Sequence, residues 1–230
     1  MSNFLFNKSG PITTITFNRP EKRNCIDDVV LLELESLVQR VRDAPETRVL
    51  VTTGSGNSFC AGADLSGSRA ISDPEERARV ARESAARFPR LVGRVADLIA
   101  HLDILTIAAI NGYAIGGGWS LALAFDFCLA VEGAEFWVPE VDMGVPYRGA
   151  PAQVLAARMG PWLAKEATIL CRHFKAEELL QLGVINRVVK AAELMSATRE
   201  LAETLAKKPA NAVAPSKRDI NAMLFGARQY

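Results

Sequence analysis

The chain has 230 residues, of which 49% are apolar and 23% are charged, and its formal net charge at pH 7 is +1. This length suits one large domain, or one domain with a small helical appendage. The near-neutral charge gives no electrostatic reason to expect nucleic acid or a membrane surface as the main partner. No run approaches the ~18 apolar residues that span a bilayer, and residues 1–8 lack the apolar core of a signal peptide. We therefore expect a cytoplasmic protein that binds neither nucleic acid nor membranes.

Cysteine and histidine usage argues against metal and redox chemistry. The four cysteines lie far apart without a C-x-x-C pair, which indicates reduced thiols. His101 and His173 are the only histidines, so a histidine-based metal site is not expected either. The sequence thus predicts neither a metal ion nor a redox cofactor.

Strands and helices alternate along the first half of the chain. Period-two runs predict strands, apolar residues at helical spacing predict helices, and Gly/Pro/Ser clusters predict turns. In chain order we first expect a hairpin of residues 4–6 and 12–17, and then a helix that is capped by Asp27 or Asp28 and ends near Arg42. A strand over 48–53 follows. After it we expect a mobile polar loop over 66–76 and a long amphipathic helix over about 75–101.

The second half begins in the same way and becomes mostly helical. The predicted strands cover residues 105–110, 127–131, 135–138 and 185–189. The predicted helices cover residues 117–125, 150–159, 162–171, 176–182, 191–207 and 210–224. Strand-strand-helix units followed by a helical tail predict an α/β fold with a helical C-terminal subdomain.

Two glycine-containing loops, at residues 59–65 and 111–118, each follow an apolar run. The triplet at 116–118 lets the backbone approach a ligand closely because no Cβ blocks it. A helix that begins there adds unpaired N–H groups and the positive end of its dipole. Alone, a glycine triplet is as readily a tight turn. Two such corners together can direct two N–H groups at one oxygen atom, which is how an enzyme stabilises an oxyanion or enolate.

Four segments, in matching order and spacing, resemble the enoyl-CoA hydratase/isomerase family, the crotonase superfamily. They are Phe17–Asn24, Phe59–Leu65, Ala109–Gly118 and Ala134–Glu140, and the similarity extends from about Ile12 to Val189. The resemblance implies a crotonase-like spiral of β-β-α units over residues 1–189, a short C-terminal helical region over 190–230, and a homotrimer or hexamer. It also implies an acyl-CoA substrate, with coenzyme A as part of the substrate and no separate cofactor.

The resemblance also assigns residues to the site. The two oxyanion-hole amides fall at the positions of Ala63 and Gly117. Contacts with coenzyme A, largely through backbone atoms, fall around Lys22, Arg23, Cys25, Ala61, Asp64 and Leu65. A thioester carbonyl held by two amides can become an enolate, so protons on its α-carbon become labile.

Two acid/base positions distinguish reactions within this family. Hydratases carry one glutamate three residues after the middle glycine of the triplet and another after the proline of the fourth segment. Here the second glutamate is Glu140, whereas the first position is Ser120, whose hydroxyl is a poor base. We therefore expect double-bond isomerisation with Glu140 as the single acid/base, and hydration is the alternative. Burial near residues 136–138 is expected to raise the pKa of Glu140 toward the range useful for proton transfer.

Two further departures from the family pattern bear on the substrate. Arg148 stands where many relatives carry a small residue, and its guanidinium matches the geometry of a carboxylate. Arg148 is thus either a surface residue or the partner of a carboxylated acyl-CoA. The latter would permit decarboxylation or C–C bond formation, as in carboxymethylproline synthases. Family members also usually continue beyond the point where this chain stops, which puts the usual acyl pocket and assembly in question.

Three interpretations come from other classes of protein. Residues 118–122 resemble a nucleophile elbow with alanine as the last residue, so Ser120 would be the nucleophile of a serine hydrolase if His101 or His173 supplied a base. Loss of the first glutamate would also be consistent with a non-catalytic subunit that binds coenzyme A. Residues 54–59 imitate a dinucleotide fingerprint but lack its third glycine, which disfavours nicotinamide binding.

Overall fold

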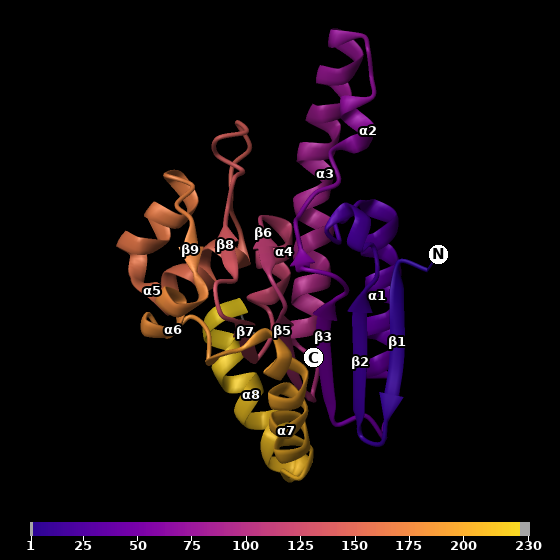
Figure 1. Cartoon of the computed structure of the whole chain (residues 1–230), viewed down its shortest axis with the longest axis vertical. Helices are drawn as coiled ribbons and strands as arrows, with labels where there is room; N and C mark the ends of the chain where they lie inside the picture. The colour runs from indigo at the N-terminus through magenta and orange to yellow at the C-terminus, as the bar shows by residue number, and fades with distance from the viewer. Residues whose placement is uncertain (1, 226–230) are drawn as a thin grey trace.

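Apolar runs of the sequence form the strands of two sheets. The computed structural model describes residues 2–225, except the side chains of residues 68, 69, 81 and 85 (Figure 1). Within this part a six-stranded sheet has the order β1 (Phe4–Ser9), β2 (Ile12–Phe17), β3 (Val49–Gly54), β5 (Leu105–Ile110), β7 (Phe127–Val131), β10 (Arg187–Val189). A four-stranded sheet has the order β4 (Ser58–Cys60), β6 (Tyr113–Ile115), β8 (Glu135–Trp137), β9 (Phe174–Lys175).

The chain repeats one unit, which gives a strand to each sheet and then a helix. β3 and β4 precede α2 (Ser66–Arg69) and α3 (Pro74–Ala100), β5 and β6 precede α4 (Gly117–Ala122), and β7 and β8 precede α5 (Ala150–Ile169). Successive units pair in parallel within both sheets. The predicted spiral of β-β-α units is therefore confirmed.

The larger sheet carries the hydrophobic core. β1 and β2 form the predicted antiparallel hairpin, and the strands from β2 to β10 pair in parallel. Parallel strands covered on both faces read as continuous apolar runs. Accordingly, residues 49–51 of β3 and 107–110 of β5 are at most 2% exposed. The runs that preceded the two glycine loops in the sequence are thus the rigid centre of the fold.

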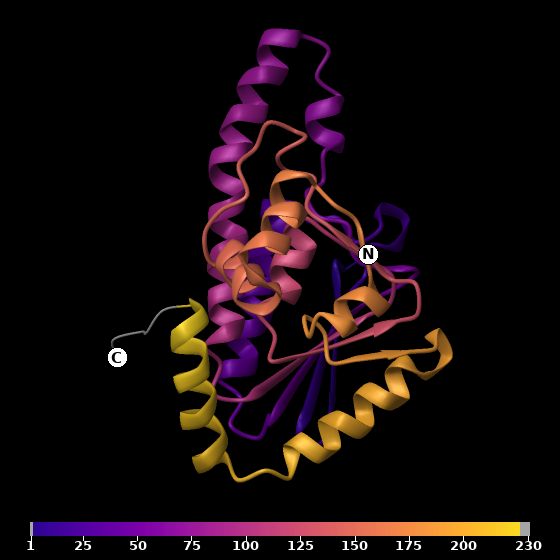
Figure 2. The same cartoon turned by 90° about the vertical axis from the view of Figure 1, so that its left-hand side faces the viewer.

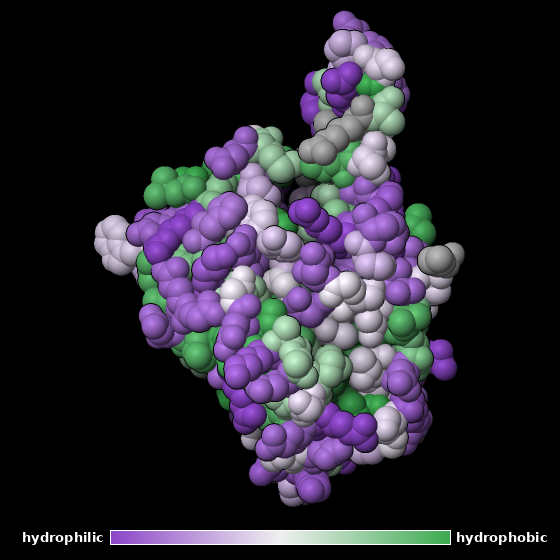
Figure 3. All heavy atoms as spheres, viewed as in Figure 1, coloured by the Kyte–Doolittle hydropathy of each residue, from purple (hydrophilic) through white to green (hydrophobic). Residues whose placement is uncertain are grey.

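Helices α1 (Asp28–Arg42) and α3 pack on each other. The Asp27 side chain caps α1 by accepting a hydrogen bond from the Val30 N–H, and Asp73 caps α3 in the same way. The N-terminal end of α3, with α2, projects beyond the body of the molecule in both views (Figures 1 and 2). Where this projection meets the body, the surface is hollowed (Figure 3).

Helices α6 (Ala176–Gln181), α7 (Leu194–Ala206) and α8 (Ala210–Phe225) follow the repeated units. α7 packs on β3, β5 and β7, whereas α8 packs on α5 and α3. The Lys217 ammonium anchors α8 by donating to the Asp126 carboxylate and to the Ile104 carbonyl, both at 2.8 Å. The predicted boundary after residue 189 stays a prediction, and residues 226–230 of the predicted C-terminal region lie outside the described residues.

The structure differs from the predicted elements in six places. Residues 58–60, 113–115 and 174–175 form β4, β6 and β9, which are too short for a sequence periodicity to reveal. α4 ends at Ala122 because residues 123–125 turn into β7. The predicted break between two helices is a kink at Gly160, where φ is +81°, inside α5. The predicted loop over 66–76 contains α2. In the described part of the chain, none of the helices has the length and apolar character that a membrane crossing requires.

Candidate active site

The two glycine loops lie against each other at the ends of β4 and β6. A Cβ atom on Gly118 would lie 2.2 Å from the carbonyl oxygen of Cys60. A Cβ atom on Gly62 would lie 2.8 Å from the Ile115 carbonyl oxygen and 3.6 Å from the Gly117 nitrogen. Only glycine permits such an approach of one backbone to another. The close packing of the two loops therefore depends on the glycines that the sequence placed there.

Within the described residues, two backbone N–H groups remain available at this contact. Ile26 forms a bridge with Ala63 in which the Ile26 N–H donates to the Gly62 carbonyl and the Ile26 carbonyl accepts from the Asp64 N–H. This pattern turns the N–H of Ala63 away from Ile26. Gly117 is the first residue of α4, so its N–H has no partner within the helix. These two groups are the donors expected for an oxyanion hole.

Apolar side chains lie beside Gly117. A Cβ atom on Gly117 would lie 3.2 Å from Cε1 of Phe88 and 3.4 Å from Cδ1 of Ile26. Phe88 comes from α3 and Ile26 from the segment before α1, so two elements far apart in sequence supply the apolar surroundings of Gly117. A hydrogen bond formed in such surroundings is electrostatically stronger than one in water.

Glu140 follows β8 and lies over the second loop. Its Oε1 would be 2.6 Å from a Cβ atom on Gly116, which is the residue before the Gly117 donor. Its Oε2 is buried and has no hydrogen-bond partner within the described residues. Burial disfavours the charged form and raises the pKa of Glu140 to about 7. A carboxyl group with this pKa exchanges protons readily at neutral pH, as we expected from the sequence.

Ser120 lies on the first turn of α4, three residues after Gly117. Its hydroxyl donates to the Gly116 carbonyl at 3.0 Å and pairs with the hydroxyl of Tyr147 at 2.9 Å. Burial and the nearby Glu140 carboxylate raise the pKa of Tyr147, so the phenol stays protonated. Two neutral hydroxyls therefore occupy the place where a hydratase would carry its first glutamate. The sequence alone did not assign Tyr147 to the site.

Arg148 follows Tyr147 on the loop between β8 and α5, and its side chain is exposed. Tyr147 packs against the core, whereas Arg148 lies at the surface. The proposed pairing of Arg148 with a substrate carboxylate therefore stays a prediction.

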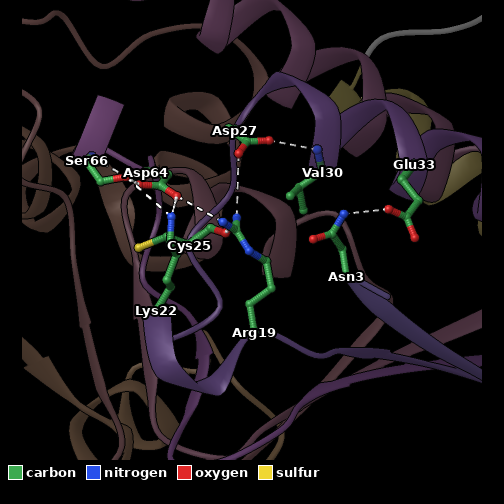
Figure 4. Close-up of polar contacts among 9 residues, drawn as sticks. All are labelled: Asn3, Arg19, Lys22, Cys25, Asp27, Val30, Glu33, Asp64 and Ser66. Atoms are coloured by element: carbon green, nitrogen blue, oxygen red, sulfur yellow. Dashed lines mark hydrogen bonds and ion pairs between the residues drawn. The ribbon is translucent and has the colours of Figure 1, made fainter. Parts of the chain in front are cut away.

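Three of the residues expected to contact coenzyme A, Lys22, Cys25 and Asp64, come together at one edge of the first loop (Figure 4). The Asp64 carboxylate accepts hydrogen bonds from Lys22 at 3.0 Å, from Arg19 at 3.1 Å and from the Ser66 hydroxyl at 2.5 Å. Burial alone would raise the pKa of Asp64, but the hydrogen bonds from Ser66 and Lys22 outweigh it and hold the pKa well below its usual range. Asp64 is therefore fixed as an anion between two cations.

Backbone contacts join the remaining members of this set. The Ala61 N–H donates to the Arg23 carbonyl at 3.1 Å, so residues 22–25 run beside residues 61–65. Arg23 is exposed, and its guanidinium lies 5.6 Å from the centre of the Tyr113 ring. Cys25 and Leu65 are half-buried. Arg19, which sequence reasoning missed, holds this turn by donating to the Cys25 carbonyl at 2.8 Å.

Asn24 is a second residue whose role only the structure reveals. Its side chain is buried and ties its own turn to the connection between β3 and β4, because it accepts from the Arg19 N–H and donates to the carbonyls of Ser55 and Ser58. Arg23 and Asn24 both have a positive φ, of 51° and 56°. In the sequence, the only indication of a role for Asn24 was its position at the end of the family segment Phe17–Asn24.

The structure gives no support to the serine-hydrolase alternative. Ser120 bonds to Gly116 and Tyr147, whereas His101 bonds to Asp97 at the end of α3 and His173 stacks on Trp137. Neither imidazole is thus placed to act as its base. Among the described residues, no three metal-binding side chains come together.

The fold and the site together define a class of enzyme. Turns of β-β-α structure bring two amide donors and one carboxylate of raised pKa to the same place, which suits stabilisation of an oxyanion while a proton moves. A family model described as enoyl-CoA hydratase/isomerase matches residues 7–228. The chain belongs to this family and is an enzyme that acts on an acyl-CoA.

Curated relatives and solved structures agree with this assignment. The chain is 31% identical over 222 residues to a short-chain-enoyl-CoA hydratase of Clostridium acetobutylicum, covering 96% of this chain and 82% of that protein. It is 37% identical over 211 residues to a carnitinyl-CoA dehydratase of Salmonella enteritidis, covering 91% and 77%. An enoyl-CoA hydratase structure from Bacillus anthracis superimposes with a TM-score of 0.85 at 29% identity, covering 96% of this chain and 83% of that chain.

Proposed function

We propose that this enzyme shifts a carbon–carbon double bond in an enoyl-CoA thioester, with Glu140 as its single acid/base. The observation that carries the proposal is that, among the described residues, Glu140 is the carboxylate placed beside the two amides. Glu140 has a pKa of about 7 and a buried, unpartnered Oε2, and it faces a neutral Ser120–Tyr147 pair rather than a second carboxylate. One such group suffices to carry a proton from one carbon to another.

The proposed reaction has two proton transfers. The N–H groups of Ala63 and Gly117 donate to the thioester oxygen. Glu140 removes a proton from the α-carbon of a 3-enoyl-CoA, and the electron pair moves toward the thioester oxygen to form a dienolate. The protonated Glu140 then returns the proton to the γ-carbon, which leaves the double bond between the α- and β-carbons. The two amides stabilise the charge at the moment it develops, because they are fixed beforehand.

Hydration is the second candidate, because curated relatives of this chain are named hydratases. In that reaction Glu140 would protonate the α-carbon while water adds to the β-carbon. The Ser120–Tyr147 pair could position this water, but a neutral hydroxyl activates it poorly. We therefore rank hydration below isomerisation.

Deuterium exchange tests the proposal. We expect wild-type enzyme in D2O to exchange the α- and γ-protons of short 3-enoyl- and 2-enoyl-CoA thioesters and to interconvert them. Glu140→Gln should reduce this exchange by about 100-fold or more, since a general base contributes on that scale. Glu132→Gln, an exposed glutamate at the end of β7, is the matched control and should retain it. If Glu140→Gln exchanges protons at the wild-type rate, the proposal is refuted. If wild-type enzyme forms 3-hydroxyacyl-CoA faster than the isomeric enoyl-CoA, hydration is favoured.

The assembly and the cellular location belong to the same proposal. We propose a homotrimer or a hexamer, supported by the large apolar side chains of Trp162 and Ile169 in the second half of α5 and of Leu170 directly after it, all of which are exposed. A cytoplasmic location is supported by the four cysteines, all of which are free. Light scattering on the purified protein tests the assembly, and a monomer would contradict it.

A further inference from the structure

The Arg19 guanidinium spans two segments that meet at the first glycine loop. It donates from Nη1 to the Cys25 carbonyl at 2.8 Å and from Nη2 to the Asp64 carboxylate at 3.1 Å (Figure 4). Nη1 also lies 3.7 Å from the Asp27 carboxylate. The side chains of Arg19 and Asp64 are only 14% and 9% exposed, so solvent screens their contact weakly. A guanidinium offers a separate N–H group to each acceptor, whereas an ammonium is a single point of charge.

These contacts lie on either side of the bridge that orients Ala63. Ile26 donates to the Gly62 carbonyl and accepts from the Asp64 N–H, both at 2.8 Å. Ala63 lies between these two residues, so the bridge determines where its N–H points. Arg19 holds the carbonyl of the residue before Ile26 and the side chain of the residue after Ala63. The guanidinium therefore makes a second connection across the same bridge.

The main chain of Arg19 is itself fixed. Its N–H donates to Oδ1 of Asn24 at 2.8 Å, and its carbonyl accepts from the N–H groups of Lys22 and Asn24 at 3.0 and 2.9 Å. Lys22 also reaches the Asp64 carboxylate, but the Lys22 side chain is 43% exposed and is expected to contact coenzyme A. Arg19 is thus the more shielded of these two cations that hold Asp64.

We propose that Arg19 is a positioning residue whose guanidinium clamps Asp64 against residues 25–27 and so keeps the Ala63 N–H directed at the thioester oxygen. The inference rests on the proposed function, which gives that N–H its role as an oxyanion donor. Arg19 acts through Asp64 and the Cys25 carbonyl rather than on the substrate. Loss of the clamp should therefore weaken binding of the enolate more than binding of the substrate.

Steady-state kinetics with a short 3-enoyl-CoA measure this difference. Arg19→Gln should lower kcat about tenfold or more while KM stays within about threefold, because a misdirected donor acts mainly on the transition state. Arg19→Lys keeps the charge but loses the fork, so its kcat should fall nearly as far. The matched control is Arg94→Gln, which breaks an ion pair with Glu35 on α1 and should keep the wild-type values.

A second measurement reads the oxyanion hole without proton transfer by Glu140. Acetoacetyl-CoA ionises to an enolate that absorbs in the ultraviolet. Its bound enolate-to-keto ratio at pH 8 would be measured in Glu140→Gln, with and without Arg19→Gln. We expect Glu140→Gln to raise the ratio above that in solution, and Arg19→Gln to lower the bound ratio about tenfold.

A double-variant cycle shows whether Arg19 acts through Asp64. Asp64→Ala removes the acceptor, so the kcat of Arg19→Gln/Asp64→Ala should match that of the more impaired single variant. Effects that instead multiply would refute the clamp, because independent changes contribute additively to the free energy. Urea unfolding shows which variants are folded, and Arg19→Lys carries the test if Arg19→Gln is not.

The outcomes separate this inference from the proposed function. If wild type does not isomerise the 3-enoyl-CoA, the proposed reaction fails, and the enolate ratio still tests Arg19. If folded Arg19→Gln keeps both kcat and the enolate ratio, or if Arg19→Lys keeps the wild-type kcat, the positioning role is refuted. An enolate ratio on Glu140→Gln no higher than in solution would overturn the oxyanion hole and the role of Arg19 with it.

Discussion

Replacing Glu140 with glutamine removes an ionisable group while keeping the shape of the side chain. The carboxyl has a pKa of about 7 in the folded protein, against an ordinary value of 4.5, because burial penalises its charged form. The two values differ by about 2.5, and each pKa unit corresponds to 1.36 kcal/mol, so ionising Glu140 costs the fold about 3 kcal/mol. Glutamine is neutral at every pH and avoids this cost.

The sign of the pH dependence follows from the raised pKa. Below pH 4.5 the carboxyl is protonated in both the folded and the unfolded protein, and its contribution to stability is fully present. Between pH 4.5 and 7 the unfolded chain ionises first, so stability is lost as the pH rises, and above 7 the loss is complete. We therefore expect Glu140→Gln to gain about 2 to 3 kcal/mol on wild type between pH 5 and pH 8.

Urea unfolding at pH 5, 6, 7 and 8 measures this gain, at one protein concentration because assembly also affects stability. Glu132→Gln is the control and should follow wild type at every pH. The same titration appears in turnover: kcat/KM for proton abstraction should rise about tenfold from pH 6 to pH 8 as Glu140 ionises. A stability difference between Glu140→Gln and wild type that does not change with pH would refute the reasoning.

Three further substitutions test the scaffold around the site. Gly118→Ala places a Cβ atom 2.2 Å from the Cys60 carbonyl oxygen, so the two glycine loops must separate. We expect kcat to fall about 100-fold, and near-normal turnover would contradict the packing of the loops. Lys217→Met leaves the Asp126 carboxylate without its cation and should lower the free energy of unfolding by about 3 kcal/mol, as measured in urea. A decrease below about 1 kcal/mol would show that the ion pair does not anchor α8. Asp27→Ala removes the N-terminal cap of α1 and should lower the free energy of unfolding by about 1 kcal/mol. An unchanged midpoint of urea unfolding would contradict this role of Asp27.

Local patterns were sufficient for most of the fold. Apolar runs such as residues 49–51 and 107–110 predicted the buried parallel strands, because a strand covered on both faces needs apolar residues throughout. Asp27 predicted the start of α1, because its side chain satisfies an N–H group that the helix itself leaves unpaired. Three strands of the second sheet, β4, β6 and β9, escaped prediction, because strands of two or three residues are defined by partners in distant segments.

The sequence by itself determined which groups are available to the chemistry: two glycine loops that can expose amides, one glutamate after the fourth family segment, and a serine in place of the other glutamate. These depend on residue types at fixed spacings, which a linear sequence contains in full. Only the tertiary structure decided how the groups act. The pKa of Glu140 depends on what buries it, and the pairing of the Ser120 and Tyr147 hydroxyls joins α4 to the loop between β8 and α5. Both effects arise from contacts between separate segments, and packing alone brings those segments together.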